Sequence, residues 1–125
     1  MKIFLDTNIV VWYLKGRRDI VDLVNSIEKP YSNIIVFLES LYVYRKVLLR
    51  ANKPLKLEPV LDFFKEIDLL PIEPLDINEI TNIVKEYNIQ PNDALIALTC
   101  KHYGIDTIAT LDEDFKRIPW LKTIP

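Results

Sequence analysis

Short apolar runs alternate along the whole chain with longer segments of helical periodicity, and this alternation limits the possible folds more than any other feature. The runs are short enough to be buried strands, and we predict strands over residues 2–5, 31–34, 69–72, 107–109 and 121–124. The intervening segments predict helices over residues 9–14, 19–28, 36–52, 57–67, 76–87 and 91–103, and a helical turn over 112–117. In the helix over residues 57–67, the helical spacing of the apolar residues predicts a buried side that consists of Val60, Leu61, Phe63, Phe64 and Ile67. This order of elements indicates an α/β fold with a mainly parallel central sheet.

The composition is typical of one cytoplasmic domain. Half of the 125 residues are hydrophobic, which is enough for one sizeable core, so we expect a single domain over residues 1–125. No apolar run approaches the roughly 18 residues of a membrane-spanning helix. An acid as early as Asp6 interrupts the apolar core that a signal peptide needs. The lone cysteine, Cys100, cannot form an internal disulfide and favours a reducing compartment.

The chain lacks several groups that enzymes commonly use. His102 is the only histidine, so two imidazoles cannot serve as acid and base, and one histidine with one cysteine cannot form a tetrahedral zinc site. Gly16 and Gly104 are the only glycines, which excludes a P-loop and a dinucleotide-binding turn. The net charge of −2 argues against a protein that coats nucleic acid, but allows an enzyme that binds one short strand locally. The chemistry must therefore rest on carboxylates, hydroxyls, amides and basic side chains.

Four acids occupy positions where a site would form in such a fold. Asp6 and Asp112 follow predicted strands, and polar residues beyond the carboxyl ends of parallel strands tend to form the site. Glu39 and Asp93 lie near the starts of predicted helices. Each acid also has a structural explanation, since Asp6 and Asp112 can cap helical segments and a first-turn Asp93 suits the helix dipole. Glu39 can be one more exposed helical acid.

The surroundings of two of these acids favour a functional site. Glu39 lies between the apolar residues 36–38 and Leu41, and Asp93 precedes the apolar run 94–98, so we expect both carboxylates to be partly buried. Two unit charges about 4 Å apart repel by ~1 kcal/mol in water and ~4 kcal/mol at an effective dielectric constant of about 20. Converging carboxylates therefore need a cation or take up protons, and Mg²⁺ or Mn²⁺ suits them best. One or two such ions can polarise a phosphate, activate water and stabilise a leaving oxygen without any histidine.

Three short motifs with a glutamate between them resemble the PIN domain family over essentially the whole chain, and within that family the stand-alone VapC-type toxins. In chain order they are Ile3-Phe4-Leu5-Asp6-Thr7-Asn8, then Glu39, then Asn92-Asp93-Ala94-Leu95-Ile96-Ala97, then Thr110-Leu111-Asp112-Glu113-Asp114-Phe115. The resemblance implies a three-layer α/β/α sandwich with a mainly parallel sheet of four or five strands. It also implies a metal-dependent endoribonuclease that hydrolyses RNA. The expected role is the toxin of a type II toxin–antitoxin pair, a homodimer that binds a small antitoxin.

The same resemblance implies roles for individual residues. The implied metal-binding and catalytic acids are Asp6, Glu39, Asp93 and Asp112, with Asp114 as an auxiliary metal ligand. Asn8 and Thr110 are implied as polar supports that hold a carboxylate or a metal-bound water. The chain departs from many relatives at Leu111, where they have a polar residue, and this puts one supporting contact in doubt.

Basic residues cluster beside these acids and suggest where RNA would bind. Between residues 40 and 57 there is no acid, and the basic residues are Arg45, Lys46, Arg50, Lys53 and Lys56. On a regular helix, Lys46 and Arg50 share a stripe with Glu39 and Val43, which would form a cationic track for phosphates. A second basic group that can border the groove contains Lys15, Arg17 and Arg18. The alternative interpretation is that both groups are solvated helix ends.

The remaining distinctive side chains have less specific interpretations. Four aromatic residues can stack on bases, although core or subunit packing is their usual role: Trp12, Tyr13, Tyr42 and Tyr44. We interpret Cys100 as a packing residue and His102 as a surface residue.

Three other functions fit parts of the pattern. A housekeeping RNA-processing nuclease of the same fold would have no antitoxin, and a short partner gene in the neighbouring reading frames would distinguish the two. A phosphoacceptor signalling domain needs a pair of acids after the first strand and a central aspartate, where this chain has Asp6 alone and Glu73. A non-catalytic binding module would carry clustered carboxylates that only reduce stability. The full acidic set therefore favours the nuclease.

Overall fold

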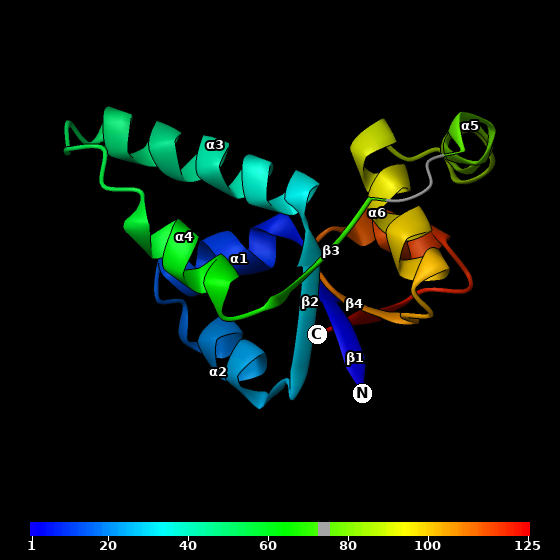
Figure 1. Cartoon of the computed structure of the whole chain (residues 1–125), viewed down its shortest axis with the longest axis horizontal. Coiled ribbons are helices and arrows are strands. Elements are labelled where there is room, and N and C mark those ends of the chain that lie inside the picture. Colours follow the sequence, from blue (N-terminus) through cyan, green and yellow to red (C-terminus); the bar gives the residue numbers. More distant parts are fainter. Residues whose placement is uncertain (73–75) are drawn as a thin grey trace.

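The computed structural model describes residues 1–72 and 76–125, and a five-stranded parallel sheet lies at its centre (Figure 1). The strands are β1 (Lys2–Leu5), β2 (Lys29–Asn33), β3 (Asp68–Leu70), β4 (Thr107–Ala109) and β5 (Lys122–Ile124). Their order across the sheet is β3-β2-β1-β4-β5, and each neighbouring pair is parallel. The predicted strands are all present. The bounds of β1 and β4 are those predicted, and the ends of β2, β3 and β5 differ from the prediction by at most two residues.

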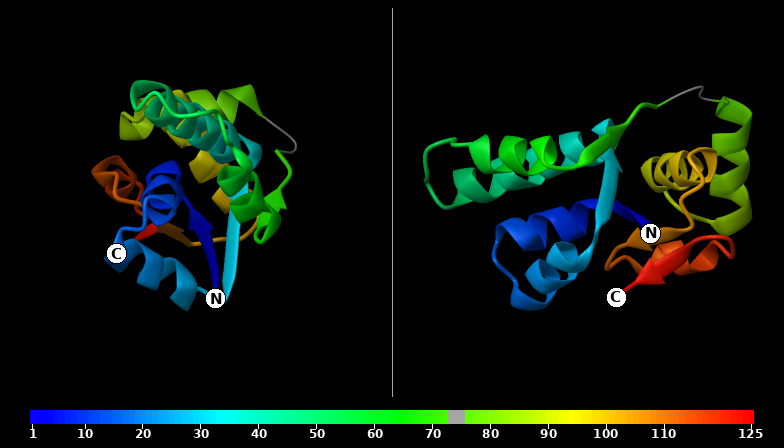
Figure 2. Two further views of the ribbon diagram at one scale, coloured as in Figure 1. Left: turned by 90° about the vertical axis from the view of Figure 1, so that its left-hand side faces the viewer. Right: turned by 60° about the horizontal axis from the view of Figure 1, so that its bottom comes forward.

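Helices cover both faces of this sheet. They are α1 (Thr7–Leu14), α2 (Arg18–Ser26), α3 (Ile34–Arg50), α4 (Glu58–Lys65), α5 (Ile77–Tyr87) and α6 (Pro91–His102), followed by the short 3₁₀ helix η1 (Glu113–Arg117). Figure 1 and Figure 2 show α1 to α4 together on one side of the sheet and α5 with α6 on the other. The expected three-layer α/β/α sandwich is therefore confirmed.

The neighbouring strands β1 and β4 are apolar because helices cover them on both faces. The fully buried residues of these strands are Phe4, Leu5, Ile108 and Ala109. In α6, residues 94 and 96–100 are also buried, as the apolar run after Asp93 predicted. Cys100 lies within this buried stretch and His102 is exposed, which confirms both interpretations.

The order of the strands reverses between β1 and β4. From β1 the chain moves outward through β2 to β3, and it then crosses to the other side of β1 to form β4 and β5. In open parallel sheets, a crevice forms beyond the carboxyl ends of the strands at such a reversal. Residues 6 and 110–112 directly follow the two strands that flank it.

The prediction for the buried side of α4 was wrong at one residue. Leu61 is 43% exposed, whereas Val60 and Phe64 are buried. These two residues are four positions apart and form the buried stripe of the helix, and Leu61 lies outside that stripe.

The end of β2 also differs from the prediction. The strand begins at Lys29, two residues before the predicted start, and includes Pro30. Pro30 is tolerated because β3 begins opposite Tyr31, so that β2 has a neighbour on only one side at this position. Ile34, predicted as the last residue of the strand, is the first residue of α3.

Two further expectations concern membrane-spanning helices and Glu73. Within the described residues, none of the helices has the length and apolar character that crossing a membrane requires. Glu73, which the phosphoacceptor interpretation used, lies outside the described residues.

Candidate active site

The carboxyl ends of β1 and β4 bring candidate residues side by side. Asp6 follows β1, and its backbone N–H donates to the carbonyl of Ala109 at the end of β4 (3.0 Å). Thr110 follows β4, and its backbone N–H donates to the carbonyl of Ile124 in β5 (2.9 Å). The parallel pairing thus continues one residue beyond each strand, and it fixes the positions from which these side chains extend.

Asp6 is a buried carboxylate that accepts hydrogen bonds from several groups. It is 5% exposed and caps α1, with Oδ1 accepting the backbone N–H of Thr7 (2.8 Å). Oδ2 accepts the hydroxyl of Thr110 (2.7 Å) and the side-chain amide of Asn8 (3.4 Å). The Thr110 hydroxyl in turn accepts the backbone N–H of Asp112 (3.0 Å). Asp6 is therefore a helix cap, and Thr110 connects it to the loop that carries Asp112.

Asn8 also binds the loop that follows β4. Its Oδ1 accepts the backbone N–H of Leu111 (3.0 Å), while its amide nitrogen donates to Asp6. The contact uses only the main chain of Leu111, so the apolar side chain at this position does not remove it. Asn8 and Thr110 both make the supporting hydrogen bonds to a carboxylate that the motifs predicted.

Glu39 reaches the site on the second turn of α3. This helix starts directly after β2 because Asn33 caps it, with Oδ1 accepting the backbone N–H of Val36 (3.1 Å). The two carboxylate oxygens of Glu39 accept different donors: Oε1 accepts the hydroxyl of Thr7 (2.8 Å) and Oε2 the side-chain amide of Asn92 (3.3 Å). Glu39 therefore ties α3 to the starts of α1 and α6.

Thr7 and Asn92 are site residues to which sequence reasoning assigned no role. Each is the neighbour of a candidate acid within a motif, Thr7 after Asp6 and Asn92 before Asp93. That adjacency is the signal that could have identified them as polar supports. Their common partner, Glu39, is distant in the sequence, and only the packing of the three helices brings it to them.

Asp93, Asp112 and Asp114 form a more open part of the site. One carboxylate oxygen of each lies within 4.8 Å of the others. Asp112 caps η1 by accepting the backbone N–H of Asp114 (2.9 Å), and Asp114 forms an ion pair with Arg117 (3.1 Å). Asp93 lies in the first turn of α6, whose cap is Gln90, and within the described residues its carboxylate accepts no hydrogen bond.

A pocket of about 330 Å³ joins the two parts of the site. The polar residues and acids that line it are Asp6, Thr7, Asn8, Glu39, Asp93 and Asp112, and the other lining residues are Val11, Trp12, Lys15 and Val43. All four acids that the motifs singled out therefore face one cavity. Asp114 lies beside it, through its proximity to Asp93 and Asp112.

The carboxylates raise one another's proton affinity. Burial raises the pKa of Asp6 from 3.8 to about 6, although hydrogen bonds from Thr110 and Thr7 act in the opposite direction. Burial, together with the negative charges of Asp6, Asp112, Glu39 and Asp114, raises the pKa of Asp93 to about 7. A cation between these oxygens would relieve both the burial and the repulsion. The donor set consists of carboxylate oxygens, which suits a hard divalent cation, so the residues present fit a divalent metal ion.

The predicted phosphate-binding residues occupy different places relative to this pocket. Lys15, at the end of α1, lines it directly. On α3, Val43 follows Glu39 by one turn and also lines the pocket, whereas Lys46 and Arg50 lie farther along the helix and are not part of its lining. A role for these two residues in binding RNA remains a prediction.

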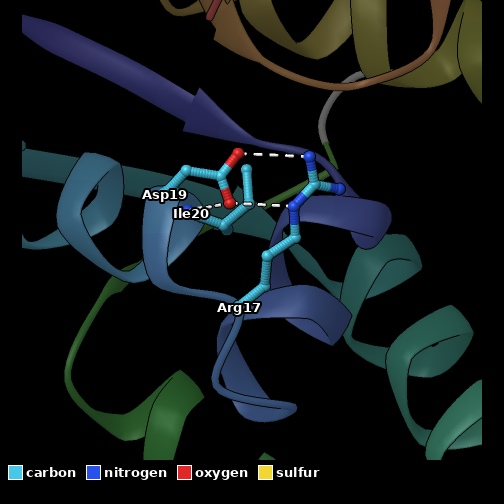
Figure 3. Close-up of polar contacts among 3 residues, drawn as sticks. All are labelled: Arg17, Asp19 and Ile20. Carbon is cyan, nitrogen blue, oxygen red and sulfur yellow. Dashed lines mark hydrogen bonds and ion pairs between the residues drawn. The ribbon is translucent and has the colours of Figure 1, made fainter.

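Arg17 is engaged in a local ion pair. Its Nε and Nη2 donate to the two carboxylate oxygens of Asp19 (2.8 and 3.1 Å), and Asp19 also accepts the backbone N–H of Ile20 (3.0 Å) (Figure 3). The hydrogen bond from Arg17 lowers the pKa of Asp19. The charge of Arg17 is therefore largely compensated within the segment that begins α2.

The four aromatic residues divide into core and surface positions. Tyr13 packs on Phe63 with 5.0 Å between the ring centroids, and Tyr44 packs against the core, so the packing interpretation is confirmed for both. Tyr42 is 63% exposed on α3. Trp12 is 39% exposed and lines the carboxylate pocket.

Sequence comparisons place these features in a family context. A family model described as the PIN domain matches residues 3–121. The chain is similar to Ribonuclease VapC2 of Methanocaldococcus jannaschii, with 32% identity over 138 aligned positions that cover 98% of this chain and 93% of the relative.

Solved structures share the fold. A toxin–antitoxin complex from Klebsiella pneumoniae contains a chain that matches with a TM-score of 0.79 at 18% identity, over 98% of this chain and 96% of that one. A DNA-bound VapBC structure from Salmonella typhimurium matches with a TM-score of 0.77 at 22% identity, over 99% and 97% of the two chains. At this level of identity the likeness shows the common three-layer architecture.

Proposed function

Because the chain belongs to the PIN domain family, we propose that it is a divalent-metal-dependent endoribonuclease that hydrolyses phosphodiester bonds in RNA. The single observation that carries this proposal is the convergence of four acids from four separate segments on one pocket: Asp6, Glu39, Asp93 and Asp112. The name of the relative Ribonuclease VapC2, which aligns with nearly the whole chain, supports RNA as the substrate.

The four acids would hold Mg²⁺ or Mn²⁺, with Asp114 as an auxiliary ligand. When bound, such an ion polarises a phosphate and lowers the pKa of water, so that hydroxide can attack in line. The residues of the chain position the ligands: Thr110 and the N–H of Thr7 fix Asp6, while the Thr7 hydroxyl and Asn92 fix Glu39. Fixed carboxylates hold an ion without having to reorganise when it binds, which favours both affinity and catalysis.

RNA cleavage with and without metal tests this proposal. Purified protein should cleave a short unpaired oligoribonucleotide in Mg²⁺ or Mn²⁺ and should be inactive in EDTA. Asp93→Asn should lower the rate by more than about 100-fold, since even groups that only hold a metal ligand contribute about 10- to 100-fold. Asp62→Asn, which changes an exposed acid on α4, is the matched control and should retain activity. Equal cleavage in EDTA, or by the Asp93→Asn protein, would rule out the mechanism.

We further propose that the enzyme is the toxin of a toxin–antitoxin pair and acts as a homodimer in the cytoplasm. The support is the set of solved relatives, among them the Klebsiella pneumoniae toxin–antitoxin complex and the VapBC complex of Salmonella typhimurium. A short reading frame beside the gene should encode a small protein that co-purifies with this chain and inhibits cleavage. Sedimentation of the isolated chain tests the homodimer. A chain that cleaves RNA but has no such neighbour would instead be a housekeeping nuclease.

A further inference from the structure

One face of α1 leads from the acids to the outer end of the pocket. Besides the N-cap Asp6, the residues of this helix and its C-cap that line the pocket are Thr7, Asn8, Val11, Trp12 and Lys15. Their spacing of one, three or four positions places them on a single helical face. With a rise of about 1.5 Å per residue, Trp12 lies about 9 Å along the helix from Asp6. The pocket therefore has an acidic end at the start of α1 and a second end farther along this helix, called the outer end here, which is lined by an indole, two valines and one lysine.

The indole at this outer end is exposed to a degree that core packing does not explain. Trp12 is 39% exposed, while Val11 beside it is only 8% exposed and belongs to the buried part of α1. Val43 of α3 also lines the pocket, so its outer end has apolar walls on two helices. A flat aromatic surface next to a phosphate-processing site suits a nucleobase, because each base has a π-face and stacking on an aromatic side chain is independent of its sequence.

The charges beside the indole complement a nucleotide. Lys15 Nζ lies 5.0 Å and Arg17 Cζ 5.3 Å from the centroid of the Trp12 ring. Asp19 compensates Arg17, whereas Lys15 forms no salt bridge within the described part of the chain. The lysine has a flexible stem, so its ammonium can move from the ring to a phosphate.

The end of α1 holds this arrangement in place. Gly16 has a φ of +80°, a conformation that favours glycine, and its N–H donates to the carbonyl of Tyr13 (3.0 Å). The N–H of Arg17 donates to the carbonyl of Trp12 (3.0 Å), which completes a Schellman motif. The helix therefore stops directly after Lys15, and Arg17 returns to the side of the indole.

We infer that Trp12 and Lys15 form a nucleotide subsite beside the acids, in which the indole stacks on a base of an unpaired RNA strand and the ammonium binds an adjoining phosphate. This inference rests on the proposed ribonuclease function and specifies its substrate. In a duplex, neighbouring bases cover both faces of each base, so the indole can stack only on an unpaired one.

Kinetics of variants test the subsite. Trp12→Ala should raise KM for a short unpaired oligoribonucleotide by about tenfold or more, and Trp12→Phe should restore most of the affinity. Lys15→Met should raise KM less and should reduce the salt dependence of binding by about one phosphate contact. Trp120 and Lys101 provide the matched controls, because the Lys101 Nζ lies 5.7 Å from the Trp120 ring centroid outside the carboxylate pocket. Trp120→Phe and Lys101→Met should leave KM unchanged.

A change in the RNA locates the stacked base. Replacing single nucleotides of the oligoribonucleotide by abasic ones should weaken binding to the natural protein most strongly at one position near the cut. At that position the Trp12→Ala protein should show no further loss, because its stacking partner is already missing. An unchanged KM for Trp12→Ala, or equal sensitivity of both proteins to the abasic change, would overturn the inference.

Fluorescence separates failure of the subsite from failure of the proposed function. In a protein with Trp120→Phe and Asp93→Asn, Trp12 is the sole tryptophan and cleavage is not expected, so binding of the oligoribonucleotide should quench its emission. If the natural protein cleaves no RNA, the proposed function fails, and quenching still reports on the subsite. If it cleaves RNA and emission is unchanged, only the subsite is lost. If Trp12→Ala alters inhibition by a co-purifying antitoxin but not KM for RNA, the surface binds protein, and the inference is overturned.

Discussion

The two halves of the acidic site are built in opposite ways. At the ends of β1 and β4, Asp6 is almost fully buried and accepts hydrogen bonds from Thr7, Thr110 and Asn8. At the start of α6, Asp93 is half-buried, and within the described residues it accepts no hydrogen bond. The pKa of both carboxyl groups is raised, but of these two only Asp6 has hydrogen-bond donors that stabilise its charge.

The difference indicates how the fold tolerates a cluster of negative charge. The first half belongs to a hydrogen-bonded network that stabilises the fold, called the frame here, because its hydrogen bonds also cap α1 and hold the loop between β4 and η1. In the second half, the carboxylate of Asp93 has no hydrogen bond within the described residues and faces the pocket as an uncompensated negative charge. A divalent cation would compensate this negative charge, while the frame would keep the remaining metal ligands in position. Changes in the two halves should therefore affect stability with opposite signs.

The largest expected effect is a pH-dependent loss of stability in the metal-free protein. The pKa values of about 7 for Asp93 and about 6 for Asp6 lie above the 3.8 of the unfolded chain, so the folded protein binds more protons in this range. The resulting stabilisation is fully present below about pH 4 and is lost as the pH rises through about 7. In EDTA we expect Tm to fall by on the order of 5–10 °C between about pH 5 and about pH 8.

Calorimetry over this range, with and without Mn²⁺, measures the effect. The ion should restore much of the lost Tm at the higher pH, because it replaces the protons. A Tm that does not change with pH in EDTA would show that burial and mutual repulsion do not raise the pKa values of Asp93 and Asp6.

The next largest effect should come from neutralising the open half. Asp93→Asn keeps the shape of the side chain and removes the charge that costs most, so the metal-free protein should gain several degrees in Tm at about pH 8 and lose much of its pH dependence. Asp22→Asn, at an exposed acid paired with Arg18, is the control and should change Tm little. A lower Tm for Asp93→Asn in EDTA would contradict the proposed difference between the halves.

A change in the hydrogen-bonded half should have the opposite sign. Thr110→Val removes the hydroxyl that donates to Asp6 and accepts from the backbone of Asp112. Asp6 Oδ2 would then lose one donor, and the backbone N–H of Asp112 would lose its acceptor. The loss should reduce the free energy of unfolding by about 1–3 kcal/mol. Urea denaturation measures this, and Thr110→Ser should retain most of the stability. Equal stability of the valine variant would mean that Thr110 is not part of the frame.

The smallest effect should appear at the contact that joins α1 to α3. Thr7→Val removes the hydroxyl bound by Glu39 but leaves the backbone N–H that Asp6 accepts. We expect a loss of about 1 kcal/mol in stability and several-fold weaker Mn²⁺ binding, measured by calorimetric titration. Thr7→Ser should restore the affinity for the ion. If the serine variant binds Mn²⁺ as weakly as the valine variant does, the hydroxyl does not position Glu39.

Much of the fold followed from local pattern. β4 (Thr107–Ala109) was predicted with its observed bounds, and the helix predicted over residues 76–87 corresponds to α5 with Asp76 as its cap. The misplaced residues, Leu61 and Pro30, depend on tertiary context: which stripe of α4 meets the core, and where β3 begins beside β2. Neither is encoded within a window of neighbouring residues.

The acids show the same division between local and tertiary information. The sequence by itself determined that this chain has only one histidine and one cysteine, and that Asp6, Glu39, Asp93 and Asp112 occur in the order of a known family. Only the tertiary structure decided that Thr7 and Asn92 bind Glu39, that Asp6 is part of the frame while Asp93 is open, and that Trp12 lines their pocket. The reason is physical: residue types and their spacing fix which helices and strands form, whereas hydrogen bonds and burial between them depend on how those elements pack.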